Sequence, residues 1–157
     1  MPTECSAERF DFGIVEGRIV EAAFDAGLVT SDAGALLLGA TDRAIDLVGR
    51  FADCFRDHRR QDLIEHAIGT LVGQRVFGMA LGYEDLNDHD ELRHDPLMAV
   101  LSGKLAARRE NCAPVAGKST LNRLELCRGD PPDQHDIAHS SPARRASALL
   151  LGPSARR

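Results

Sequence analysis

The feature that most constrains the fold of this chain is an apolar stripe between Asp62 and Leu81. Its side chains recur at three- and four-residue spacing, as one face of an α-helix requires: Ile64, Ala67, Ile68, Leu71, Val72, Val76, Met79 and Ala80. Four glycines fall within or just after the stripe, although each costs a helix about 1 kcal/mol relative to alanine: Gly69, Gly73, Gly78 and Gly82. This pattern predicts a helix that is either closely approached by another helix or weak.

The flanking segments predict a β-hairpin and further helices. Residues 9–29 alternate apolar and polar side chains on both sides of Glu16-Gly17, which is typical of a hairpin. Residues 30–55 predict a helix capped by Thr30 or Ser31, with this buried face: Leu37, Thr41, Ala44, Val48, Phe51 and Phe55. Shorter helices are predicted over residues 97–106 and 119–127. We therefore predict the α+β class, with an N-terminal β-hairpin followed by a mostly α-helical region.

Length and composition limit the class of protein. The chain has 157 residues, which fits one domain with a real core. No apolar run approaches the roughly 20 residues that cross a bilayer, and the opening MPTECSAERF lacks the basic and apolar parts of a secretory signal. We therefore expect a cytoplasmic protein. Its cysteines match no zinc template and are expected to be free thiols: Cys5, Cys54, Cys112 and Cys127.

The run from Gly82 to Pro96 is dense in charge. It holds six carboxylates and two histidines against one arginine. Such a cluster is typical either of a metal or acid–base site or of a capped junction between two helices. An EF-hand would need glycine at Asp90 and glutamate at Pro96, and His89 and His94 are five apart instead of the four that suit zinc on one helix face. The spacing favours the capped junction and predicts no metal site.

The segment APVAGKST, residues 113–120, matches a phosphate-binding loop only in part. Cys112 stands where the pattern needs glycine, and Pro114 removes a backbone N–H that the loop would use. Ser119 or Thr120 as a helix cap explains these residues as well. A helix N-terminus beside Lys118 could also hold a DNA phosphate with the same orphan N–H groups.

Charge is distributed unevenly along the chain. Residues 1–103 contain 9 Lys and Arg against 19 Asp and Glu, whereas residues 104–157 contain 10 against 5. A basic end on an acidic body indicates either a solvated basic face or contact with phosphate.

Four segments together resemble one family. They are RFDF (9–12), FDAGLVTSDAGALLL (24–38), QRVFGMALGYEDLNDHDELRHDP (74–96) and GKSTLNRLEL (117–126). In this order, over about residues 8–128, the chain resembles the DDE transposases of bacterial insertion sequences, specifically the insertion-sequence 1380 group. The resemblance implies a protein that cuts and rejoins DNA at transposon ends.

The resemblance also implies where catalysis would lie. In that superfamily, three carboxylates on an RNase H-like fold bind two divalent ions, usually Mg²⁺. The matched segments belong to the region ahead of this core, so no catalytic role is assigned to these acids: Asp25, Asp85, Asp88 and Asp90. We expect residues 1–128 to be the transposase N-terminal region and residues 129–157 to be a divergent, weakly ordered tail. The chain is then truncated before the RNase H-like catalytic core.

The first functional hypothesis is an N-terminal fragment of a DDE-type transposase that binds transposon ends and is catalytically incompetent alone. It would contact DNA through Arg75, Arg93, Lys118, Ser119, Thr120 and Arg123, as a homo-oligomer or a mixed oligomer with full-length transposase. The alternatives are a protein-interaction module that modulates an intact transposase, or a small metal-binding protein. Mg²⁺ is expected for the full-length family, with no cofactor and no membrane partner for this chain.

Overall fold

The computed structural model describes residues 9–23, 32–126 and 137–139. Strands β1 (Arg9–Val15) and β2 (Arg18–Ala23) come first, and strands β3 (Phe55–Asp57) and β4 (Ile137–His139) pair later in the chain. The helices are α1 (Ala35–Ile45), α2 (Leu47–Ala52), α3 (Ile68–Ala80), α4 (His89–Leu92), α5 (Pro96–Leu101) and α6 (Lys118–Glu125). Two 3-10 turns are η1 (Gln61–Leu63) and η2 (Leu86–Asp88). The predicted class, a hairpin followed by a mostly helical region, is confirmed.

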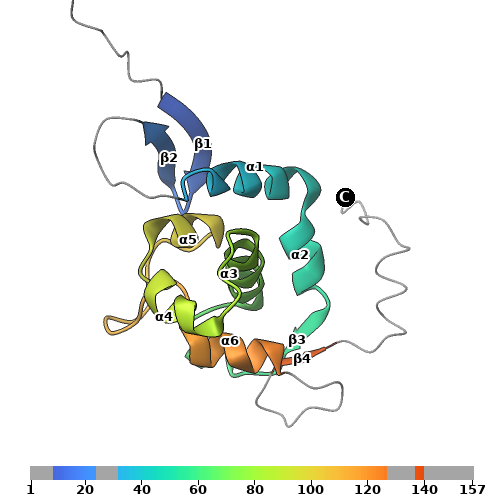
Figure 1. Cartoon of the computed structure of the whole chain (residues 1–157). Helices are drawn as coiled ribbons and strands as arrows, with labels where there is room; N and C mark the ends of the chain where they lie inside the picture. The colour runs from blue at the N-terminus through green and yellow to red at the C-terminus, as the bar shows by residue number, and fades with distance from the viewer. Residues whose placement is uncertain (1–8, 24–31, 127–136, 140–157) are drawn as a thin grey trace, which may run out of the picture.

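Helix α3 lies at the centre of the molecule, with the other helices arranged around it (Figure 1). Its Leu71 and Val72 are fully buried in one core cluster with Leu121 and Leu124 of α6. A second cluster joins Phe77 of α3 to residues of α4, α5 and the loop before α6. The stripe predicted from the sequence is confirmed only in part. Leu71 and Val72 are in the core, but Ala67, Met79 and Ala80 are exposed, and the helix begins at Ile68 and not at Asp62.

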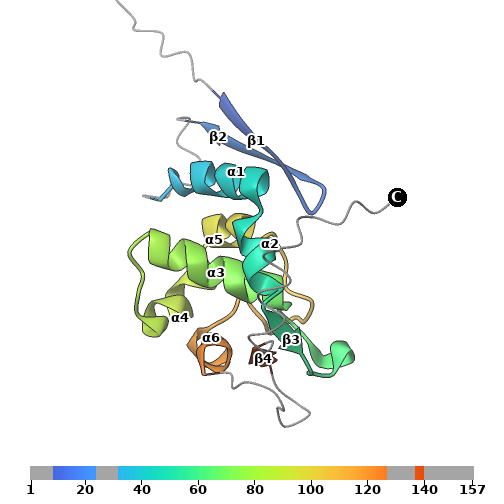
Figure 2. The same ribbon diagram turned by 90° about the vertical axis from the view of Figure 1, so that its right-hand side faces the viewer.

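The hairpin turns where the sequence predicts. Glu16 and Gly17 both have positive φ, 47° and 75°, which a two-residue type I′ connection requires. The strands are antiparallel and pair Val15 with Arg18 at the turn. The hairpin lies against α1 in both views (Figures 1 and 2), where the Arg43 guanidinium donates a 2.9 Å hydrogen bond to the carbonyl of Phe12. This packing supplies the partner that an isolated hairpin lacks.

The single helix predicted over residues 30–55 is wrong. The helix breaks at Asp46, which has φ 53° and ends α1, and α2 begins at the next residue. The predicted buried face is also wrong in part, because Leu37 and Phe51 are 65 % and 47 % exposed. Helix α1 buries Ala35, Leu36 and Gly39 instead, since a Cβ at Gly39 would lie only 2.9 Å from Leu101 of α5. Helix α5 can approach α1 closely at Gly39, so the side of α1 that carries Gly39 faces the core.

The close approach that the glycine spacing predicted is confirmed only in part, because Gly69 and Gly82 face open space. A Cβ at Gly78 would lie 2.8 Å from Cε1 of His89, a fully buried residue at the start of α4. The helices at 97–106 and 119–127 are confirmed in place, with ends shifted to α5 and α6. Strand β4 lies within the segment 129–157 and buries Ile137 and Ala138, while the rest of that segment and the caps Thr30 and Ser31 fall outside the described residues.

Candidate nucleic-acid interface

The acidic run forms a capped junction, as predicted. Asp85 accepts a 2.8 Å hydrogen bond from the backbone N–H of Asn87 at the start of η2, and Asp95 accepts one of 2.7 Å from Leu97 at the start of α5. The bond from Asn87 lowers the pKa of Asp85. Asp90 reaches across the fold to accept a 3.1 Å bond from the N–H of Lys118, the first residue of α6. Three of the six carboxylates are therefore used as helix caps.

Helix α6 therefore begins differently from the sequence expectation. Its cap residue is Gly117, which has no capping side chain, and Ser119 lies inside the first turn. The cap comes from Asp90 on another helix, and a Cβ at Gly117 would stand 2.9 Å from its Oδ1 atom. The hydrogen bond from Lys118 lowers the pKa of Asp90, which keeps this cap charged. The predicted Ser119 or Thr120 cap is thus replaced by a tertiary one.

A buried polar clamp fixes the loop that leads into α6. Gln74 Nε2 donates 2.7 Å to the carbonyl of Ala116, and Gln74 Oε1 accepts 2.8 Å from the Ala116 N–H. Gln74 Nε2 also lies 3.1 Å from Nδ1 of His89, and both side chains are fully buried. Burial lowers the pKa of His89 and favours the neutral ring. The Gln74 and His89 positions of the 74–96 segment therefore act in folding.

The six residues predicted to bind DNA lie in different surroundings. Arg75 is largely enclosed, with a side chain 14 % exposed that bonds to Glu125 and, at 2.7 Å, to the carbonyl of Glu84. The Lys118 ammonium lies 3.3 Å from the Asp90 carboxylate. The remaining four line two adjoining hollows beside α6: Arg93, Ser119, Thr120 and Arg123. The structure brings these four together and holds Arg75 apart from them.

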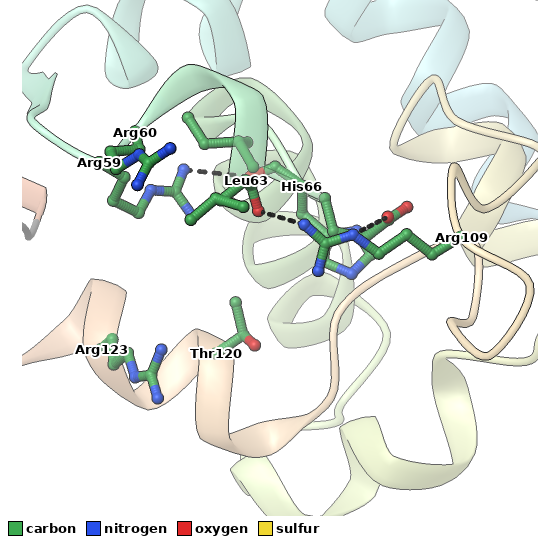
Figure 3. A pocket seen from close by; sticks show the side chains of 9 residues that line it. Arg59, Arg60, Leu63, His66, Arg109, Thr120 and Arg123 are labelled. Atoms are coloured by element: carbon green, nitrogen blue, oxygen red, sulfur yellow. Dashed lines mark hydrogen bonds and ion pairs between the residues drawn. The ribbon is translucent and has the colours of Figure 1, made fainter.

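We call the two hollows together the α6 groove. One, of about 440 Å³, is lined by Arg59, Arg60, Arg109 and Arg123, and the other, of about 490 Å³, by Arg93 and Ser119. Glu65, His66 and Thr120 line both, so the two hollows adjoin, and the second is also lined by Asp90 and Glu110. In Figure 3, Arg59, Arg60, Leu63, His66 and Arg109 form one side, and Thr120 and Arg123 of α6 form the other.

The wall opposite α6 is the segment 63–66, whose four carbonyls each accept a hydrogen bond from a basic side chain. The donors are Arg109 to Leu63 at 2.9 Å, Arg108 to Ile64 at 2.7 Å, Lys104 to Glu65 at 2.6 Å and Arg59 to His66 at 3.1 Å. Side chains from two separate stretches of chain, residue 59 and residues 104–109, thus fix the backbone of this segment. The sequence predicted a helix across this segment, with Ile64 in its apolar stripe, and that part of the prediction is wrong because α3 begins only at Ile68. Arg59, Arg60 and Arg109 were not expected to join α6.

Ionisation inside the groove is set by burial and pairing. Burial raises the pKa of Glu65, but hydrogen bonds from Lys104 and from the Arg108 N–H outweigh it, so the pKa lies below its usual value. Burial, aided by the nearby Lys104 charge, lowers the pKa of His66 to about 4. His66 is therefore neutral near pH 7, and the positive charge of the groove comes from its arginines.

Comparison with known proteins gives the family. A family model described as "Transposase DDE domain group 1" matches residues 12–148, which is most of the chain. The chain belongs to this transposase family. The match extends past residue 128, where the sequence predicted a domain boundary, and that boundary stays a prediction. No match was found among curated proteins or among solved structures.

Membership implies a DNA substrate and, for the family, Mg²⁺. The described residues do not fit a two-metal site, because no three of their His, Cys, Asp and Glu side chains are placed to hold an ion. Asp85 and Asp90 face backbone N–H groups of η2 and α6 instead. Within the described ranges, Cys54 and Cys112 are free thiols, and no helix is long and apolar enough to cross a membrane.

Proposed function

We propose that this transposase-family chain binds transposon-end DNA through the α6 groove, as the N-terminal region of a member of the insertion-sequence 1380 group acting in the cytoplasm. The observation that carries the proposal is the gathering of five arginines along one groove of a protein with net charge −5: Arg59, Arg60, Arg93, Arg109 and Arg123. Arginine forks match phosphate oxygens, and such contacts position a protein on DNA.

The arginines differ in how much of their charge is available. Arg59 is held by Asp57 through two bonds of 2.8 and 2.7 Å, and both side chains are mostly buried. Arg60 pairs with Asp62 at 2.7 Å, but both are more than half exposed, so this pair contributes little and is readily exchanged for phosphate. Arg123 is exposed and has no ionic partner among the described residues. We therefore assign phosphate contact first to Arg123 and Arg60.

The test is a salt titration of binding to a labelled duplex that carries the transposon end. Arg123→Gln and Arg60→Gln should each weaken binding, and each should reduce the slope of log affinity against log salt by about 1. Arg9→Gln is the matched control, because Arg9 is exposed at the far end of the hairpin and, among the described residues, pairs with Glu21. Binding by the wild type that is independent of salt, or equal losses in all three variants, would refute the proposal.

A second function is favoured by one observation, the exposed apolar face of α1 and α2. Leu37, Ile45, Leu47 and Phe51 are 47 to 65 % exposed, and the sequence pattern predicted part of this face to be buried. A contact with another copy or with a full-length transposase would cover it. Light scattering of the wild type and of Leu37→Ser with Phe51→Ser tests this. If the wild type is a monomer and does not associate with a full-length relative, this second function is refuted.

A further inference from the structure

Leu63 is the one large exposed apolar side chain, among the described residues, that lines the α6 groove. Its side chain is 56 % exposed, yet it lines the same hollow as Arg60, Arg109 and Arg123. The other large apolar side chains that the described residues expose lie outside both hollows, on the hairpin, α1, α2 and the ends of α3 and α6. An apolar group surrounded by guanidinium groups adds nothing to phosphate binding. It suits a ligand that has anionic and apolar surfaces side by side.

The backbone that carries Leu63 is held in place. The Leu63 N–H donates 2.9 Å to the Arg60 carbonyl within η1, and the Leu63 carbonyl accepts 2.9 Å from Arg109. The next three carbonyls are fixed by Arg108, Lys104 and Arg59 in the same manner. A side chain on such a backbone is presented at a fixed place, so little conformational entropy is lost when it meets a ligand. Figure 3 shows it between Arg60 and Arg109.

We propose that Leu63 packs against the face of an unstacked DNA base while the arginines of the groove hold the neighbouring phosphates. The inference rests on the proposed DNA binding and adds a substrate preference. In a smooth duplex the base faces are covered by stacking, so Leu63 gains nothing there. Apolar side chains that contact base faces do so where a step is unstacked. The groove therefore prefers DNA that is unpaired or distorted at one position over fully matched duplex.

The experiment compares two labelled duplexes of equal length and charge, one fully matched and one with a short internal mismatch that contains 2-aminopurine. The wild type should bind the mismatched probe about fivefold more tightly, which is what burying half a leucine side chain supplies. Its binding should also change the 2-aminopurine fluorescence, which reports stacking. Leu63→Ala should bind the matched probe like the wild type and lose both the preference and the fluorescence change.

Two further variants make the result specific. Leu63→Met keeps an apolar side chain and should retain the preference, whereas Ile19→Ala removes an exposed apolar side chain from the hairpin, outside both hollows, and should change nothing. Circular dichroism is the folding control, and we expect the Leu63 variants to be folded because Leu63 is exposed.

The outcomes separate the two proposals. If the wild type binds both probes equally, or if Leu63→Ala keeps the mismatch preference, the Leu63 inference is overturned and DNA binding stands. If the wild type binds neither probe, both are overturned. Loss of the preference in Leu63→Ala, with retention in Leu63→Met, supports the inference.

Discussion

The acidic junction of residues 82–96 and the α6 groove are both dense in charge, but their charges are used differently. In the junction, Asp85, Asp90 and Asp95 accept hydrogen bonds of 2.7 to 3.1 Å from backbone N–H groups that begin η2, α6 and α5. In the groove, Arg60 and Arg123 remain exposed around a hollow of about 440 Å³. Clustered charge in a sequence does not by itself indicate a binding site, because internal hydrogen bonds can use much of it, as they use three of the six carboxylates of this junction.

The largest expected effect concerns the clamp that joins the junction to the groove. Gln74→Leu leaves the N–H and the carbonyl of Ala116 without their partners in a fully buried position. Each unsatisfied buried group costs roughly 1–3 kcal/mol, so we expect the free energy of unfolding to fall by about 3 kcal/mol. Urea denaturation measures it. Gln61→Leu, at an exposed position of η1, is the control, and equal stability of both variants would contradict a structural role for this segment.

The second prediction concerns pH and the groove wall. His66 has a folded pKa of about 4 against a usual 6.5, so between these values the unfolded chain binds a proton that the folded chain does not. Stability should therefore fall as the pH drops from 6.5 toward 4. Because the ring is partly exposed, we expect a loss of about 2 kcal/mol and not the full shift. Denaturation across this interval should show it in the wild type and not in His66→Gln; parallel curves would refute it.

A smaller effect is expected from removing a single cap in the junction. Asp95→Ala removes the acceptor for the Leu97 N–H, which should cost about 1 kcal/mol of unfolding free energy. DNA affinity should not change, because Asp95 lies outside the groove lining. Glu91→Ala, an exposed residue of the same acidic run, is the matched control. Weaker or tighter DNA binding by folded Asp95→Ala would mean that the junction also takes part in recognition.

The smallest expected effect is that of added Mg²⁺ on the melting temperature. Mg²⁺ at millimolar concentration should leave the melting temperature of the free chain unchanged relative to NaCl of equal ionic strength, because the junction carboxylates are already paired with N–H groups. Incubation with a transposon-end duplex and Mg²⁺ should likewise give no nicked product. A rise in melting temperature that Asp85→Asn with Asp88→Asn abolishes, or nicking that these changes stop, would show that the junction binds metal.

The sequence predicted local structure well where neighbouring residues decide it. The Glu16-Gly17 turn, the burial of Leu71 and Val72 on α3 and the capping by Asp85 depend on backbone angles, on side-chain periodicity and on bonds two residues apart. The face of α1 was mispredicted because its inner side was chosen by the approach of Leu101 at Gly39, which no periodicity reveals. The Ser119 cap failed for a similar reason, since Asp90 supplies the bond from another helix.

By itself, the sequence determined the hairpin and its turn, the approximate places of α3, α5 and α6, the segments by which the chain resembles DDE transposases, and the use of part of its acidic run as caps, since these follow from short-range chemistry and from order along the chain. Only the tertiary structure decided which charges face a common surface. Arg60 lies 49 residues before Arg109, and Arg123 follows 14 residues later, yet all three line one hollow because α6 and the segment 63–66 pack on either side of it. The groove depends on how far apart α6 and the segment 63–66 lie, and that separation is fixed only when the core around α3 has formed.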